Sequence, residues 1–449
     1  MGLAGASTAI AEGIDGASAN AAAPAVRDSY SYDWFDYDID VDASLPGAYA
    51  GTDFDNHGAN TDPATKAIVN GFLYAHAGAL VQFGQIGAAA TAEFFQYGVQ
   101  PQSQQSGVTM VYGRYHAQLA YGAANNQIVV GAGVRIVTLQ VRSQGSTFLN
   151  PGQTLLTLDG AGPEVGAVFK PNGLPFRLGA TVRAPVSASV GGVVGQVGQF
   201  FGGSGSGSSS GTPVGQQQDG YWLPSVATLP WEFEAGFALQ LGPRPLNPAW
   251  LNPHDMEESL RKRIDQARKA RLAEYTRELA IQPANERAAK RRAEEAREES
   301  IRHIEDLELD AEILRLRQIR VAREANWPRE RITVVGSFLA TGPSSNAVSL
   351  EGFATKTLDY VGRNISIAPR VGIESEPVAN WVHARVGSYL EPSRFENGTA
   401  RQHFTVGGDV KVFHFSPWGI FGEGIWRVNF SADLAPRYAN YGLGFGMWH

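Results

Sequence analysis

Apolar and polar residues alternate along much of this chain, and the alternation returns in segment after segment. From Thr109 to Ala123 the odd positions are mainly apolar or aromatic, whereas the even positions include Arg114, His116 and Gln118. A period of two residues indicates a β-strand. This stretch is longer than the roughly 5–6 residues of a typical strand in a soluble protein. Long strands with one apolar and one polar face are typical of a transmembrane β-barrel.

Fourteen segments share this pattern, and together they predict an all-β transmembrane barrel of 14 antiparallel strands. The connections alternate between short turns and longer polar loops, as between the periplasmic and external ends of an outer-membrane barrel. An even number of strands then places the N- and C-termini on the periplasmic side. The predicted strands are 29–42, 68–83, 87–98, 107–122, 127–142, 160–170, 175–186, 220–241, 330–341, 363–375, 380–391, 400–415, 420–432 and 437–449.

Composition narrows the class of protein further. The chain has no cysteine, which excludes disulfides and thiol chemistry, and its net charge of −7 argues against a nucleic-acid partner. It contains no apolar run long enough for a transmembrane helix. The start at Met1 lacks a signal peptide, so we expect a mature or trimmed chain. A cytosolic protein with a Gly/Ala-rich start is the alternative.

One segment breaks the strand pattern. Between Asp255 and Arg331 nearly every second residue is charged, with both signs interleaved. Apolar residues recur there at steps of three and four, which predicts a helical coiled-coil hairpin inserted between strands 8 and 9. The expected domains are a hatch (1–28), strands 1–8 (29–242), the hairpin (243–328) and strands 9–14 (329–449). The predicted seam comprises Met256, Leu260, Ile264 and Ala267 in the first arm, and Ala289, Ala293, Ala296, Ser300, Ile304, Leu307, Ala311 and Leu314 in the second.

The polar faces of several strands carry charges, which cannot face lipid cheaply and must therefore line the lumen. One interpretation is a polar permeation path or binding surface. The other is a ladder of salt bridges that fills the barrel and holds the N-terminal segment. The lumen-lining candidates are Arg114, His116, Arg370, Glu374, His383, Arg385, Asp409, Lys411, Glu423 and Arg427.

Four smaller features carry hypotheses of their own. Pro185 and Pro230 remove ladder donors from sequential strands, which predicts either a wall gap or bulges near a rim. Gly442, Gly444 and Gly446 share the inner face of the last strand, either making room for residues 1–27 or easing curvature. The Gly/Ser-rich run 202–211 predicts a flexible external loop. The aspartates Asp33, Asp36, Asp38, Asp40 and Asp42 suggest either a cation site or a solvated lumen face.

The N-terminus carries a family resemblance. The small-residue stretch Met1–Ala11, Gly16–Asn20 and the pair Pro24 and Ala25 resemble the hatch of FadL-like outer-membrane proteins, although three alanines separate Asn20 from Pro24. The resemblance implies a 14-stranded barrel plugged by its N-terminus, with Asn20 and Pro24 in the hatch. It also implies transport of hydrophobic compounds with release through the wall. A PorV-like branch implies protein secretion and surface attachment instead.

These observations lead to two functional hypotheses. The first is passive transport of a hydrophobic small molecule across the outer membrane of a Gram-negative bacterium, with the lipid bilayer and lipopolysaccharide around the barrel. The second is a scaffold whose periplasmic arm, residues 255–325, docks a partner protein of an envelope or secretion complex. No nucleophile lies beside a base, and the histidines lack ligand spacing. We therefore expect no enzyme activity, no metal and no cofactor.

Overall fold

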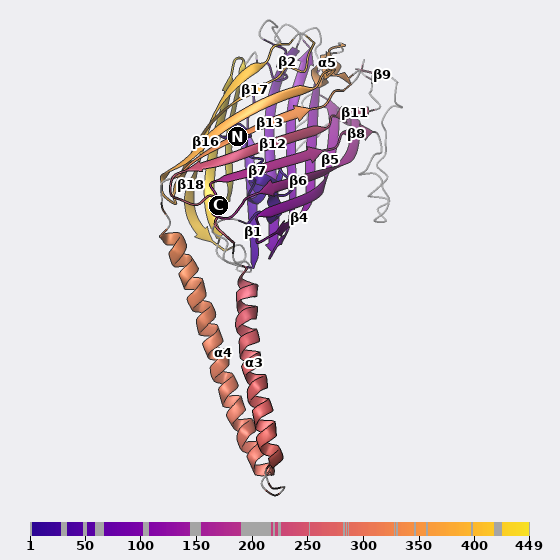
Figure 1. Ribbon diagram of the computed structural model, residues 1–449. Helices are drawn as coiled ribbons and strands as arrows, with labels where there is room; N and C mark the ends of the chain where they lie inside the picture. The colour runs from indigo at the N-terminus through magenta and orange to yellow at the C-terminus, as the bar shows by residue number, and fades with distance from the viewer. Residues whose placement is uncertain are drawn as a thin grey trace. The chain divides into compact units, whose positions relative to one another are not determined.

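The structure is a computed structural model of the chain, and Figure 1 shows it as a ribbon. It describes all residues except 1, 28–33, 48–51, 59–66, 102–106, 144–153, 190–216, 219–220, 223–225, 251, 282, 284, 286, 327, 329–330, 345–346, 356–357, 397, 417–423 and 449. The chain divides into two units. One comprises residues 1–29, 35–249 and 329–449; the other comprises residues 30–34 and 250–328.

The larger unit is built from long antiparallel strands. The first half of its wall contains β1 (Phe35–Ser44), β2 (Ala67–Phe83), β3 (Ile86–Pro101), β4 (Val108–Ala123), β5 (Ile128–Ser143), β6 (Thr154–Phe169), β7 (Phe176–Arg183), β8 (Val186–Ser189), β11 (Val226–Leu229) and β12 (Glu232–Leu241). The second half contains β13 (Ile332–Thr341), β16 (Ser366–Val378), β17 (Val382–Glu391), β18 (Arg401–Phe415), β19 (Gly424–Ala435) and β20 (Tyr438–Met447).

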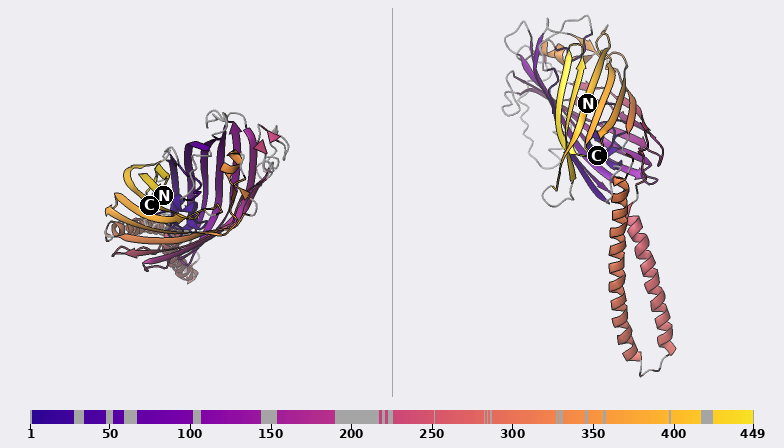
Figure 2. Two further views of the ribbon diagram at one scale, coloured as in Figure 1. Left: turned by 90° about the horizontal axis from the view of Figure 1, so that it is seen from above. Right: turned by 90° about the vertical axis from the view of Figure 1, so that its left-hand side faces the viewer.

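Hydrogen bonding closes these strands into a ring. Neighbouring strands follow one another from β6 down to β1, then from β20 to β16, and on through β13, β12 and β7. Pairing of β7 with β6 completes the circle, so fourteen strands form a closed barrel. The view from above in Figure 2 shows the early and late strands on opposite sides of the ring. The predicted fold class is confirmed, and each predicted strand has a counterpart.

Two strand boundaries differ from the prediction. The first wall strand begins at Phe35 rather than 29, and the preceding Trp34 stacks on His254 of the smaller unit with ring centroids 4.6 Å apart. The sixth strand begins at Thr154 instead of 160. There Leu155, Leu156 and Leu158 all belong to one buried cluster, because the register against β5 shifts at Leu155, and the two-residue period is lost. The Gly/Ser-rich run 202–211 lies outside the described residues.

Exposure follows the predicted alternation along the strands. On β4, Leu119 is 65% exposed and Tyr121 47%, whereas His116 and Gln118 are each 3% exposed. The later strands repeat the pattern, with exposed Val371, Val386, Val406 and Val410 on their outer faces. An apolar outer surface around a polar interior is the reverse of a soluble sheet and fits a lipid solvent. Among the described residues, no helix combines the length and apolarity needed to cross a membrane.

The N-terminal segment 2–27 lies inside the barrel as a hatch. It contains α1 (Gly13–Ala17) and a 3-10 turn (Ala23–Ala25). Asn20 is fully buried and donates to the carbonyls of Thr8 at 3.0 Å and Ala167 at 3.1 Å, while the carbonyl of Pro24 accepts from Gln82 at 2.8 Å. These bonds satisfy buried polar groups that water cannot reach, and they fasten the hatch to β2 and β6.

Glycines on the inner wall make the space for the hatch. A Cβ on Gly87 would lie 1.8 Å from the carbonyl oxygen of Pro24, and one on Gly179 would lie 2.2 Å from that of Thr8. Of the two interpretations of the glycines in the last strand, room for the hatch is wrong. A Cβ on Gly444 or Gly446 would meet the carboxylate of Asp42 or Asp40, and one on Gly442 would meet Ser431 and Ser44. The glycines that do face the hatch are Gly78, Gly87, Gly131, Gly166, Gly179, Gly372, Gly387 and Gly407.

The smaller unit is an antiparallel helical hairpin, in which α3 (Pro253–Ile281) and α4 (Arg287–Ala325) lie side by side (Figures 1 and 2). Along the chain it falls between β12 and β13, the eighth and ninth wall strands, as predicted. The predicted seam is wrong for the second arm, because all eight of its positions in α4 are exposed. Leu309 is the most buried of the described side chains of α4, at 7% exposure.

Charged side chains make the actual seam. Arg268 of α3 donates to Glu305 at 2.6 Å, and Arg271 lies 3.2 Å from Glu298 and 2.8 Å from Glu305. Long arginine side chains can cover apolar surface while keeping their charge in water. In the first arm, Leu260 and Ile264 are half-buried as predicted, whereas Ala267 is exposed. The hairpin therefore closes through salt bridges around a narrow apolar strip.

Candidate functional site

The lumen divides into a charged zone and an apolar zone. Along β4 the inward positions change from Val108, Met110 and Tyr112 to Arg114 and His116. The same change occurs on β3, from Val99 and Tyr97 to Glu93 and Thr91, and on β5, from Val141 and Leu139 to Arg135. Since these strands are paired in register, the two zones form continuous layers inside the wall.

In the charged zone, carboxylates and guanidinium groups form a connected network. Asp409 is fully buried and accepts from Arg385 at 2.8 Å and from Arg427 at 3.0 Å. Arg385 also donates to Glu374 at 2.7 Å, and Arg427 pairs with Asp15 of the hatch. The network therefore links β16, β17, β18 and β19 to the N-terminal segment. Buried charges that lack such partners would cost several kcal/mol each.

Most of the lumen-lining candidates belong to this network or to its neighbours. Arg114 donates to Glu93 at 2.8 Å, and His116 lies 2.9 Å from Glu164. Arg370 lies 3.3 Å from Glu234. His383 and Lys411 lie beside the ring of Trp448, His383 stacking on it and also lying 3.3 Å from Asp409. Glu423 lies outside the described residues.

A cavity of about 380 Å³ lies between the hatch and the wall within the charged zone. Both hatch residues and strand residues line it, among them Asp15, Asp42, His76, Arg331, Arg385 and Arg427. The mixed charges make this space suited to water and small polar solutes instead of apolar molecules. It is separate from the apolar zone, none of whose buried residues line it.

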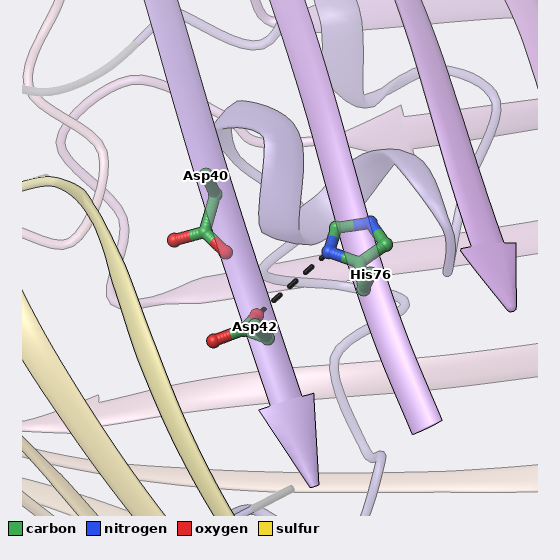
Figure 3. Close-up of side chains that lie close together, drawn as sticks. All are labelled: Asp40, Asp42 and His76. Atoms are coloured by element: carbon green, nitrogen blue, oxygen red, sulfur yellow. Dashed lines mark ion pairs between the residues drawn. The ribbon is translucent and has the colours of Figure 1, made fainter. Parts of the chain in front are cut away.

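One group at the cavity wall has donor atoms suited to a cation. The side chains of Asp40, Asp42 and His76 offer ligand atoms that all lie within 4.8 Å of one another (Figure 3). His76 Nδ1 lies 3.7 Å from Asp42 Oδ2, and Arg427 lies 3.5 Å from Asp40. The guanidinium group supplies positive charge where a cation would have to sit. This group therefore fits the lumen network better than a metal site.

The apolar zone contains a cage of aromatic rings. Phe54, from the segment after β1, has its ring centroid 5.1 Å from that of Phe72, 4.9 Å from Phe95 and 5.9 Å from Tyr97. Leu350 and Phe353 of α5 (Leu350–Thr355) pack against the same cluster. Its buried members are Phe72, Tyr97, Val99, Val108, Met110, Leu139, Val141, Leu155, Leu156, Leu158 and Ala188.

Polar contacts hold Phe54 in this cage. Asp53 Oδ1 lies 2.8 Å from His57 Nδ1, and His57 Nε2 lies 3.5 Å from Glu351 of α5. Arg401 donates to the carbonyl of Asp53 at 2.6 Å, which ties the segment to β18. Residues 52–58, which we call the latch, are therefore held over the apolar zone by contacts to α5 and β18.

Acidic groups around the latch have unusual titration. Burial raises the pKa of Glu351 to about 7, and that of Asp55 to about 6. Burial lowers the pKa of His57, but its hydrogen bond to Asp53 and the charge of Glu351 outweigh this and raise it overall. Carboxyl groups that keep their protons near neutral pH avoid a concentration of negative charge in a buried site.

The ladder of strand pairing has a break beside the apolar zone. Arg183 faces Glu232 and Val186 faces Leu229, so the shared register sets Pro185 directly opposite Pro230. Neither proline can donate to the ladder. On the other side, β6 resumes pairing only between Asp159 and Ser189 of β8. The two prolines singled out in the sequence are thus brought together in one break.

Arg135 fills this break from β5. Its guanidinium group donates to the carbonyl of Ala184 at 2.9 Å and to Glu232 at 2.9 Å, and the side chain is fully buried. Ala188 of β8 belongs to the apolar cluster, so the break borders the apolar zone. Sequence reasoning missed both Arg135 and Phe54. The apolar residues at even positions 108–112 were the one signal that β4 changes character along its length.

Comparisons with known proteins bear on the fold only. Neither protein-family models nor curated proteins match the sequence. Among solved structures, a FadL homologue from Pseudomonas aeruginosa aligns over 100% of this chain and 97% of its own, with 12% identity and a TM-score of 0.48. The CymD monoaromatic hydrocarbon channel aligns over 99% and 96%, with 9% identity and a TM-score of 0.46. A TodX mutant, also a monoaromatic hydrocarbon channel, aligns over 97% and 93%, with 10% identity and a TM-score of 0.45.

Proposed function

We propose that this chain is an outer-membrane barrel through which a hydrophobic small molecule crosses passively. The observation that carries the proposal is the apolar zone inside a lumen that is otherwise charged. Polar solutes need no such zone, and apolar side chains on the inner face of a strand are unnecessary for holding a barrel in lipid. An enclosed apolar site with few polar groups is the usual environment for an apolar ligand.

The outer surface supports the location. Large apolar side chains are exposed around the ring, on β4 through Leu119, on β12 through Phe237 and on β18 through Phe404. In water such a surface would drive aggregation. We assign the end with the longer connections to the outside and the end where the hatch meets Gly84 to the periplasm. Both termini and the hairpin insertion then belong to the periplasmic side.

The path that we propose runs from the apolar zone to the wall break. Phe54 occupies the aromatic cage in the closed state, and its withdrawal makes room for a ligand ring. The break between Pro185 and Pro230 borders the same zone and offers a lateral exit toward lipid. Arg135 closes that exit at rest. The hatch and its salt-bridge network remain seated throughout, so the ligand avoids the charged zone.

Replacing Phe54 tests the proposal. Phe54→Ala vacates the cage, so purified protein in detergent should bind naphthalene about tenfold more tightly, as about 1.4 kcal/mol of ring competition is removed. Phe94→Ala is the matched control, because Phe94 neighbours the cage residue Phe95 yet faces outward and is 37% exposed. Absence of naphthalene binding in the native chain and both variants, together with unchanged uptake on gene deletion, would overturn the transport proposal.

The hairpin motivates a second candidate function, a scaffold whose arm docks a partner protein. The specific observation is that α4 exposes its apolar positions. Replacing residues 253–325 by a short turn should remove that partner from pull-downs while leaving naphthalene binding intact. Unchanged partners after this deletion would eliminate the scaffold function, and the transport proposal would be unaffected.

A further inference from the structure

One face of α4 carries a row of exposed, mainly apolar positions, which we call the stripe. The stripe comprises Ala289, Ala293, Ala296, Ser300, Ile304, Leu307, Ala311, Leu314, Gln318 and Val321. Its largest members are far from buried: Ile304 is 54% exposed, Leu307 and Leu314 57%, and Val321 50%. Single exposed apolar residues are common on protein surfaces. A continuous row at steps of three and four is not, and at 1.5 Å per residue it runs for about 48 Å.

The stripe lies on the side of α4 away from α3. Residues that meet α3, such as Glu298, Glu305 and Leu309, follow one another at the same steps but about half a turn away. With about 3.6 residues per turn, Glu305 and Leu309 point nearly opposite to Leu307 and Leu314. The hairpin therefore uses one face of α4 for itself and leaves a second face ready for another helix.

The spacing fixes the kind of occupant. A repeat of about 3.5 residues presents side chains that fit between those of a facing helix, as knobs into holes. From Ile304 onward the steps are regular, so Ile304, Ala311 and Gln318 take the first core position and Leu307, Leu314 and Val321 the second. A flat sheet or an extended peptide would match this row poorly.

The charges beside the stripe identify which helix fits. In a parallel pair, the residue before a first core position meets the residue five places later on the partner helix. Asp310 of one copy then meets Arg315 of the other, and His303 meets Glu308. Both contacts join groups of complementary character. Among the described residues of a single chain, Arg315 pairs with Glu312 at the surface, and 60% of the arginine side chain is exposed.

We propose that α4 pairs in parallel with α4 of a second copy of this chain, so that two hairpins form one bundle. The charged residues beside the stripe complement those of an identical helix, so the partner does not have to be a different protein. Barrels inserted into one membrane share one orientation, which favours the parallel arrangement. This last step rests on the proposed membrane location, whereas the transport of a ligand plays no part in it.

Cysteine cross-linking in membranes that carry the full chain tests the pairing. The chain has no native cysteine, so any disulfide-linked dimer must involve the single cysteine that was introduced. Ile304→Cys, Leu307→Cys, Leu314→Cys and Val321→Cys should each give a disulfide-linked dimer after mild oxidation, at least about tenfold more than the control. Arg302→Cys is the matched control, because it is exposed on α4 yet points away from the stripe.

The pattern of products decides the outcome. Dimers at all four positions support a parallel pair, whereas a dimer at one position alone means an antiparallel crossing and overturns the proposal. Cross-links to a protein of different mass, or dimers no more abundant than with Arg302→Cys, overturn it too. Because these positions are exposed, the barrel should fold in every variant, and an unchanged urea unfolding transition of the purified barrel verifies this independently.

A charge exchange sharpens the test. In the Leu307→Cys background, Asp310→Arg alone or Arg315→Asp alone should lower the dimer yield by about threefold to tenfold, because like charges then face each other. The double exchange restores the complementary contact and should restore the yield. A double variant as weak as the single ones would contradict the proposed register.

Discussion

The barrel and the hairpin use the same side chains in opposite ways. In the barrel, arginine and aspartate are buried and bonded to several partners, as Arg427 and Asp409 are, while valine and leucine are exposed. In the hairpin the ion pairs are partly exposed, and apolar side chains of α4 are exposed as well. Exposure therefore has a different meaning in each unit. On the barrel it marks the surface for lipid, and on α4 it marks a surface for another helix.

The largest expected effect comes from breaking the barrel network. Asp409→Ala leaves the guanidinium groups of Arg385 and Arg427 without their shared acceptor, and we expect it to cost about 3–5 kcal/mol of the unfolding free energy. Urea titration of the purified barrel in detergent measures this. Arg271→Ala in the hairpin, where the pairs are partly solvated, should change barrel unfolding little. Equal losses in both variants would mean that burial does not separate the two units.

The next largest effect concerns the apolar surfaces. Val371→Arg places a charge on the outer face in the middle of β16, which should cost about 2–4 kcal/mol in a bilayer. Unfolding from lipid vesicles is the measurement. Ile304→Arg on α4 is equally exposed and should leave barrel stability unchanged while abolishing the dimer. If Val371→Arg were harmless in vesicles, the outer face of the barrel would not lie in lipid.

The smallest effect is a pH dependence of the latch. The pKa values of Glu351, about 7, and Asp55, about 6, are raised above their ordinary values, so the closed latch binds more protons than the open one. Closure is therefore weakened as pH rises from about 4 through about 7. The raised pKa of His57 acts in the same direction.

Hydrogen exchange of residues 52–58, corrected for intrinsic rates, should show more protection near about pH 5 than near about pH 8. Glu351→Gln cannot lose a proton and should reduce this difference. Greater protection at the higher pH would show that charged carboxylates stabilise the latch, contrary to this account.

The strands and the insertion could be predicted because their signals are local. The alternation in 109–123 arises because one face of the strand meets an apolar medium and the other meets a polar interior. The change after Pro253 to charged residues at helical spacing is equally visible within a short stretch of sequence. The seam of the hairpin could not be predicted in the same way. Two faces of α4 carry residues at steps of three and four, so the spacing alone fits either face. The face that contains Glu305 meets α3 because Arg268 and Arg271 of α3 form ion pairs with it.

Within the barrel, the missed features depend on contacts between distant segments. Sequence places Pro185 and Pro230 on sequential strands, but only the register sets them opposite each other, and nothing nearby in sequence points to Arg135 as the group between them. One interpretation of Gly444 and Gly446 was that they face the hatch, and the other was that they ease curvature. They face Asp42 and Asp40 because β1 follows β20 around the ring, a closure that the alternation alone does not reveal.

The contacts of the hatch have a consequence for the order of assembly. The hatch is synthesised first, yet the N–H of Ala4 donates to Thr405 Oγ1 and Asp15 pairs with Arg427, and both partners lie near the other end of the chain. These contacts of the segment can therefore form only after the final strands are present. A chain that ends before β18 and β19 would lack both of these partners of the hatch.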